Sequence, residues 1–195
     1  ATESYNGANW TTVNTMNTGR QGAAGAGRQT SALAFGGSDP QQGTTESWNG
    51  SNWNTVNPLN TPRYGPAGIS NTAALAFGGF AGYKNETEKW NGTNWTQVAV
   101  LGTARYRLAG CGTDTSALAF GGYKSGGVSN DTESWNGTAW TAVNPLNGGG
   151  YSLSGAGETN TLALAFGGVA TTNSTESWNG TNWTAVSPML SGAYA

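Results

Sequence analysis

Half of the ten acidic residues in this chain recur at one position of a repeated motif, Thr-Glu-Ser-Trp-Asn-Gly and its close variants. They are Glu3, Glu46, Glu88, Glu133 and Glu176. Carboxylates placed around a ring are candidates for the paired acid–base chemistry of glycoside hydrolysis. Identical copies at identical places instead favour a repeated structural role, such as bonding a turn or an arginine of the adjacent unit. We therefore predict that the protein is not an enzyme, with a glycoside-active enzyme as the remote alternative.

Most other residue types that build catalytic or metal sites are missing. The chain has no histidine, which removes the commonest general base and metal ligand. Its single cysteine, Cys111, forms neither an internal disulfide nor a zinc cluster, and its repeat position indicates a buried thiol. The acids outside the motif are scattered and lack the spacing of a calcium loop. We expect no metal and no cofactor.

Three arginines, Arg20, Arg63 and Arg105, recur at another position, which the fourth unit fills with Gly150. Arginines gathered at a ring centre would bind an anion, whereas isolated arginines more often bridge to carboxylates. The structural interpretation is favoured here too.

Tryptophan dominates the motif, and flat indole faces are good platforms for sugars. The repetition of these tryptophans on one face of each unit instead favours packing between units of the fold. The repeated tryptophans are Trp10, Trp48, Trp53, Trp90, Trp95, Trp135, Trp140, Trp178 and Trp183.

Better binding candidates are aromatic residues that break the repeat. Phe80, Tyr83 and Tyr123 lie in the most variable segments, and Lys84 and Lys124 follow the two tyrosines directly. A ring, a cationic donor and a small polar residue together suit a glycan or a surface protein. In repeat proteins, binding specificity usually resides in the segments whose sequence varies between otherwise similar units. We predict a ligand-binding site formed by these five residues.

The spacing of the motif predicts the elements that position these residues. Its first aromatic residue recurs in steps of 43, 42, 45 and 43, and four copies of Ala-Leu-Ala-Phe-Gly-Gly alternate with it. A period near 43 accommodates four short strands with turns, and radial stacking of such units makes a β-propeller. We predict an all-β propeller of four-stranded antiparallel blades in a single domain, 1–195. The repeat units are about 1–43, 44–85, 86–130, 131–173 and a partial 174–195.

Each unit resolves into two hairpins. Asn-Gly, as in Asn49-Gly50, is a strong hairpin signal because both residues tolerate positive φ. The other hairpin joins a strand of small residues to an apolar run such as Ala73–Phe77, which lacks alternation and is therefore buried on both faces. Small residues fit where strands crowd towards the axis, so this hairpin is expected innermost and the tryptophan hairpin outermost.

The count of hairpins leaves ring closure open. Five outer and four inner hairpins make four and a half units. Either the first outer hairpin is surplus to a four-bladed ring, or a fifth blade is incomplete, or a second chain completes it. A piece cut from a longer array would look the same. Five blade positions are the favoured interpretation.

The motifs resemble a kelch-type repeat over the whole chain. The likeness rests on the Gly-Gly doublet that closes an apolar strand, on the aromatic residue and Trp downstream, and on Pro58–Arg63. Kelch proteins are β-propellers with four-stranded blades, so the resemblance implies the same fold. The wording SWNGTNW…ALAFGG is also similar to repeats of marine bacteriophage and metagenomic sequences. That likeness implies a virion or fibre-like setting and no catalytic residues.

The composition restricts the kinds of partner that we expect the protein to bind. Charged residues make up 9% of the chain and the net charge is −2, so no field attracts nucleic acid. No apolar run is long enough to span a membrane, so no membrane insertion is expected. We predict a soluble extracellular or virion-associated binding module that recognises glycans or surface proteins. A purely structural particle component is the alternative, as a homo-oligomer that completes the ring or assembles through its outer edges.

Overall fold

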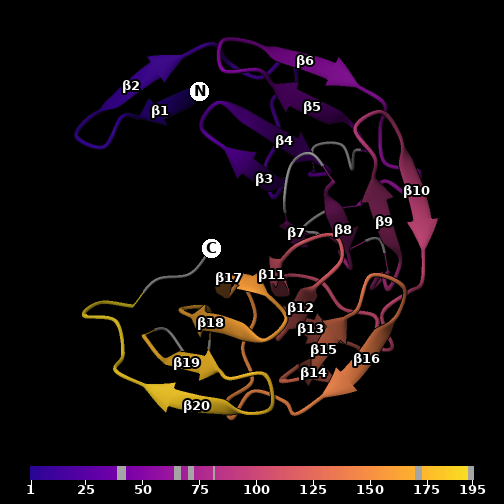
Figure 1. The fold of residues 1–195 in the computed structure, drawn as a ribbon, viewed down its shortest axis with the longest axis vertical. Helices are drawn as coiled ribbons and strands as arrows, with labels where there is room; N and C mark the ends of the chain where they lie inside the picture. Colours follow the sequence, from indigo (N-terminus) through magenta and orange to yellow (C-terminus); the bar gives the residue numbers. More distant parts are fainter. Residues whose placement is uncertain (39–42, 64–66, 70–72, 81, 170–172, 193–195) are drawn as a thin grey trace.

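The computed structural model describes residues 1–38, 43–63, 67–69, 73–80, 82–169 and 173–192, and its described part is all-β. Four antiparallel sheets of four strands stand around a common axis as a four-bladed β-propeller (Figure 1). Blade 1 comprises β3 (Ala24–Arg28), β4 (Ser31–Phe35), β5 (Thr45–Trp48) and β6 (Trp53–Val56). Blade 2 comprises β7 (Ala67–Ile69), β8 (Leu75–Phe77), β9 (Thr87–Trp90) and β10 (Trp95–Val98). Blade 3 comprises β11 (Ala109–Gly112), β12 (Ala117–Phe120), β15 (Thr132–Trp135) and β16 (Trp140–Val143). Blade 4 comprises β17 (Ser154–Thr159), β18 (Leu162–Phe166), β19 (Thr175–Trp178) and β20 (Trp183–Val186).

Two small sheets complete the described structure. The N-terminal hairpin pairs β1 (Thr2–Tyr5) with β2 (Trp10–Val13), and a short ribbon pairs β13 (Tyr123–Lys124) with β14 (Gly127–Val128). The predicted fold class is therefore confirmed. The described residues form four complete blades, so the favoured interpretation of five blade positions is wrong and the four-bladed alternative holds. The surplus outer hairpin is a separate two-stranded sheet, because no inner strand pair lies beside it among the described residues.

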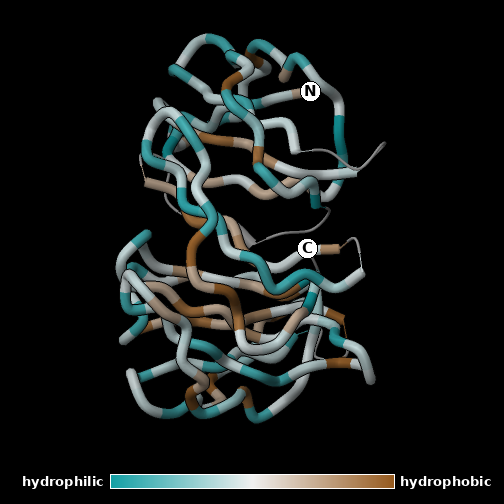
Figure 2. The backbone as a smooth tube through the Cα atoms, turned by 90° about the vertical axis from the view of Figure 1, so that its right-hand side faces the viewer, coloured by the Kyte–Doolittle hydropathy of each residue, from teal (hydrophilic) through white to brown (hydrophobic). Residues whose placement is uncertain are grey.

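The order of strands within each blade follows the sequence prediction. The small-residue strands β3, β7, β11 and β17 lie nearest the axis and contact one another in that order, while β6, β10, β16 and β20 lie outermost (Figure 1). In the side view, strongly hydrophobic stretches run through the interior and hydrophilic residues mark many of the turns (Figure 2).

Asparagine side chains build the outer turns. Asn49 Oδ1 accepts hydrogen bonds from the backbone N–H of Ser51 at 3.0 Å and of Asn52 at 2.8 Å, while Gly50 adopts a φ of +94°. This geometry closes a four-residue loop, so Trp48 and Trp53 pair directly across the hairpin. The two indoles consequently share one face of the blade.

The core lies between blades. The phenylalanine of one blade meets the second tryptophan of the next edge-on at three junctions, with centroid separations of 4.9, 5.0 and 5.0 Å. The pairs are Phe35–Trp95, Phe77–Trp140 and Phe120–Trp183. At the same junctions the indole Nε1 donates to a threonine hydroxyl of the preceding blade, at 2.9 to 3.0 Å. Each junction therefore combines an aromatic contact with a hydrogen bond that satisfies the Nε1 donor of the same tryptophan.

Candidate ligand-binding face

The site forms where two kinds of connection meet at one end of the blades. Because antiparallel strands alternate in direction, the loop after each Gly-Gly doublet and the linker into the next inner strand emerge at the same end. Backbone bonds join them: Tyr106 and Tyr123 exchange N–H···O bonds of 3.0 and 2.9 Å, and Val169 N donates to Tyr151 O at 2.9 Å. The bridges hold both connections at fixed positions.

Five aromatic rings form a continuous row over this end. Phe80 lies 5.2 Å from Tyr106 and 6.1 Å from Tyr83, measured between ring centroids, and Tyr83 lies 5.7 Å from Tyr106. The row continues from Tyr106 to Tyr123 at 5.9 Å and from Tyr123 to Tyr151 at 5.6 Å. Phe80 is 43% exposed and the four tyrosines are half-buried, so the rings are held by one another and still reach solvent. The row thus presents apolar ring surface beside tyrosine hydroxyls, which donate and accept hydrogen bonds.

One cationic side chain contacts the row, and two lysines next to its tyrosines in the sequence form ion pairs. The Arg107 guanidinium carbon lies 5.8 Å from the centre of the Tyr106 ring. Lys84 contacts Glu86 at 3.6 Å, and Lys124 donates to Asp131 at 2.7 Å. The row therefore offers flat apolar faces together with charged groups.

The environment of Asp131 lowers the pKa of its carboxyl group. Burial alone would raise that pKa, but hydrogen bonds from Lys124 and Ser129 and the nearby charges of Lys124 and Arg105 together outweigh it. The carboxylate stays ionised and binds the ammonium group of Lys124.

Sequence reasoning named most of this row and missed two members. The structure brings Phe80, Tyr83 and Tyr123 into one row, whereas Lys84 and Lys124 pair with the carboxylates of Glu86 and Asp131. Tyr106 and Tyr151 were overlooked, although they join the variable-loop aromatics into one row. The available signal was a tyrosine that recurs directly after the arginine position of the repeat.

Three of the five repeated glutamates form buried ion pairs with the repeated arginines. Glu46 pairs with Arg20, Glu88 with Arg63 and Glu133 with Arg105, and each of these side chains is at most 4% exposed. Arg105 Nη2 stands 2.8 Å from Glu133 Oε1, and Gly102 N donates to the other carboxylate oxygen at 2.6 Å.

Each pair ties the linker that enters a blade to that blade's third strand. Burial lowers the pKa of Arg63 and of Arg105, while the facing glutamate opposes that shift. In blade 4, where Gly150 replaces the arginine, Glu176 instead accepts bonds from Asn147 and Gly148.

The repeated tryptophans lie along the faces between blades. Six of the nine are at most 7% exposed: Trp48, Trp90, Trp95, Trp135, Trp178 and Trp183. Trp10 differs, because this residue is 67% exposed. The N-terminal hairpin therefore places the same residue type in a different environment.

Other site chemistry has little support in the described residues. Burial raises the pKa of the Cys111 thiol to about 12, so it stays protonated at neutral pH. No three metal-ligating side chains cluster in the described ranges. The same ranges contain no helix with the length and apolarity needed to cross a membrane.

These features define a four-bladed β-propeller with an aromatic face built by its loops. No protein-family model matches the sequence, and no curated protein matches it. Among solved structures, the structure of YjhT superposes with a TM-score of 0.76 at 11% sequence identity. The superposition covers 92% of this chain and 69% of the YjhT chain. At that identity the likeness shows a shared propeller fold.

Proposed function

We propose that this propeller is a binding module that recognises carbohydrate through its aromatic row. The observation that carries the proposal is the continuous set of rings from Phe80 to Tyr151, spaced 5.2 to 6.1 Å apart and reaching solvent. Sugar rings have apolar faces that stack on aromatic rings, while tyrosine hydroxyls and lysine ammonium groups suit their hydroxyls. Several adjacent rings suit an extended glycan better than a monosaccharide.

The setting of the module is part of the same proposal. A rigid kelch-like frame with few charges suits an extracellular or virion-associated protein, in line with the resemblance of its repeats to bacteriophage sequences. The ligand is then a glycan displayed on a surface. Catalysis by the repeated glutamates is disfavoured, because Glu46, Glu88 and Glu133 are buried against arginines.

A glycan array tests the proposal, followed by titration of the best glycan against variants. Tyr106→Ser and Tyr123→Ser remove rings from the centre of the row, and we expect each to weaken binding at least tenfold, about 1.4 kcal/mol. Tyr5→Ser is the matched control, because Tyr5 is 46% exposed and lies on the N-terminal hairpin. Equal affinity of all three variants would contradict the site, and an array without any specific glycan would contradict the ligand class.

A second candidate is a structural subunit of a particle. The exposed Trp10 and Leu164, at 67% and 40%, favour it, because such residues are usually covered in an assembly. Sedimentation over a wide concentration range distinguishes this function: a structural subunit self-associates stably, whereas a strictly monomeric protein would contradict it.

A further inference from the structure

The N-terminal hairpin is the outer half of a blade, seated on blade 1 as complete blades are seated on their neighbours. Gln29 Nε2 donates to Ser4 Oγ and to Tyr5 O, both at 2.8 Å. Asn160 makes the corresponding bonds from blade 4 to Ser134 Oγ and Trp135 O of blade 3, both at 3.0 Å. The hairpin β1–β2 therefore occupies a regular position, and only the inner half of its blade lacks a strand pair in the described structure.

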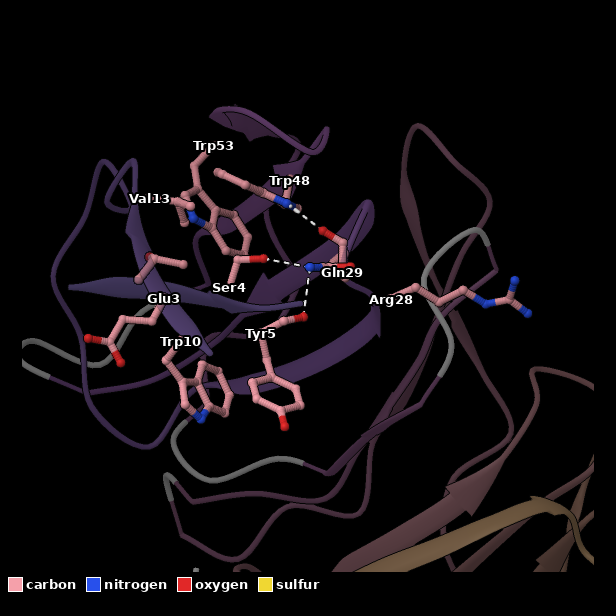
Figure 3. Close-up of a pocket in the computed structure, with 11 residues that line it drawn as sticks. Glu3, Ser4, Tyr5, Trp10, Val13, Arg28, Gln29, Trp48 and Trp53 are labelled. Carbon is pink, nitrogen blue, oxygen red and sulfur yellow. Dashed lines mark hydrogen bonds between the residues drawn. The ribbon is translucent and has the colours of Figure 1, made fainter. Parts of the chain in front are cut away.

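One wall of this inner position lies on blade 1. Trp53 corresponds to Trp95, Trp140 and Trp183, each of which contacts a phenylalanine of the preceding blade. The Trp53 Nε1 atom is buried and has no hydrogen-bond partner among the described residues. A cavity of about 300 Å³ opens here, and Tyr5, Trp10, Ala32, Trp48 and Trp53 are among the residues that line it (Figure 3). The cavity lies where the other junctions place an inner strand and its phenylalanine.

The opposite wall lies on blade 4. Leu164 is 40% exposed, whereas its repeat counterparts Leu33, Leu75 and Leu118 are at most 3% exposed beneath the next blade. A second cavity, of about 560 Å³, is lined by Leu162 and Leu164 among others. Leu162 itself is 66% exposed. Both walls carry the side chains that elsewhere cover the two faces of an inner hairpin.

The edge of β1 supplies the backbone for such a strand. In blade 1, β4 pairs with β5 so that Phe35 faces Thr45, Ala34 faces Glu46 and Leu33 faces Ser47. β1 has the same Thr-Glu-Ser sequence, and in the described structure it pairs with β2 on one side only. An unpaired strand edge is a template for strand addition.

We propose that this position binds an inner hairpin of the same repeat type from another polypeptide: a Gly- and Ala-rich strand followed by Ala-Leu-Ala-Phe-Gly-Gly. The apolar strand adds antiparallel to β1, with its phenylalanine opposite Thr2 and its ring against Trp53. Its alanines face Leu162 and Leu164 of blade 4. The bound hairpin completes a fifth blade whose outer half is β1–β2.

The probe is a synthetic peptide with the sequence of residues 153–168, the inner hairpin of blade 4, added to the full chain. We expect saturable binding at one peptide per chain, a change in tryptophan fluorescence and a higher unfolding temperature, since ligands of the native state stabilise it. The matched control peptide replaces the residue equivalent to Phe166 by Ser. We expect its affinity to be at least 100-fold lower, because it cannot fill the contact with Trp53.

Variants of the protein test the surface on β1 and blade 1 to which the hairpin would bind. Glu3→Pro removes a backbone donor from the β1 edge, and Trp53→Ala removes the ring that meets the phenylalanine; both should abolish peptide binding. Val128→Ser, on the β13–β14 ribbon, should leave binding unchanged. If Trp53→Ala fails to fold, the comparison of the two peptides still tests the proposal, because both peptides are added to the protein without any substitution. The proposal is overturned by an absence of binding at millimolar peptide, or by equal affinity of the two peptides.

Discussion

The junction between blades 3 and 4 and the open position beside the N-terminal hairpin contain the same motif in two environments. At the closed junction, Trp183 is 5% exposed, meets Phe120 at 5.0 Å and donates to Thr132 at 3.0 Å. At the open position, Trp10 is 67% exposed and Trp53 Nε1 has no partner among the described residues. The burial of a repeat residue is therefore set by its neighbour, as expected for a fold stabilised by contacts between adjacent units.

The closed junctions also contain a cluster of polar contacts, here called the clamp, in which backbone N–H groups and an arginine of the linker bind the repeated glutamate. Among the described residues, the open side lacks this clamp. Asn60 N and Thr61 N donate to Glu88 at 2.7 and 3.1 Å, and Arg63 pairs with the same carboxylate. Glu3 is exposed, although it occupies the same repeat position. A buried carboxylate without such donors would cost several kcal/mol, so the clamp and the burial occur together.

The largest difference between closed and open sites is expected for tryptophan. Trp95→Ala removes a buried indole and its bond to Thr45, so we expect a loss of about 3–5 kcal/mol in the free energy of unfolding. Trp10→Ala removes an exposed indole and should cost under about 1 kcal/mol. Urea unfolding followed by far-UV circular dichroism measures both. Equal losses would show that the hairpin is as tightly covered as the blades.

The clamp should give the next largest effect. Arg105→Met leaves Glu133 buried with its two backbone donors, so we expect a loss of about 3 kcal/mol. The double variant Arg105→Met, Glu133→Gln should recover part of it, because no unpaired charge remains. Blade 4 already lacks the arginine, and there Glu176 accepts hydrogen bonds from Asn147 and Gly148. A double variant less stable than the single one would contradict this account.

A smaller effect is expected for the indole hydrogen bond. Thr87→Val keeps the shape of the side chain and removes the acceptor of Trp140 Nε1, which lies 2.9 Å away. We expect a loss of about 1–2 kcal/mol, because an indole donor is left unsatisfied. Thr175→Val, at the corresponding position on the open face of blade 4, should change stability by less than about 0.5 kcal/mol. Thermal unfolding of the two variants side by side makes the comparison.

The smallest effect should come from the half-buried ion pair of Lys124 and Asp131. The pKa of Asp131 is lowered in the folded state, so its ionised form stabilises the fold above the unfolded pKa of about 3.9. That contribution is lost as the pH falls through the lower, folded pKa. Asp131→Asn should cost under about 1 kcal/mol at pH 7, and the difference from the parent should vanish in strong acid. A difference that persists at pH 2 would point to packing instead of charge.

Local sequence determined the blades. Asn-Gly turns, paired tryptophans and the apolar run before Gly-Gly specify hairpins through short-range geometry, and their period specifies radial stacking. The innermost place of the glycine- and alanine-rich strands was predictable for the same reason, since only small side chains fit near the axis. These features need no knowledge of distant contacts.

Tertiary structure decided which residues meet. Tyr106 and Tyr151 join Tyr83 and Tyr123 only because linkers and loops from different blades emerge at one end, and no local pattern encodes that proximity. The pairing of Arg63 with Glu88, 25 residues apart, likewise depends on how the linker enters the blade. The exposure of Trp10 is the sharpest case: its motif matches that of Trp95, Trp140 and Trp183, but each of those meets a phenylalanine of the preceding blade, and no phenylalanine contacts Trp10 among the described residues.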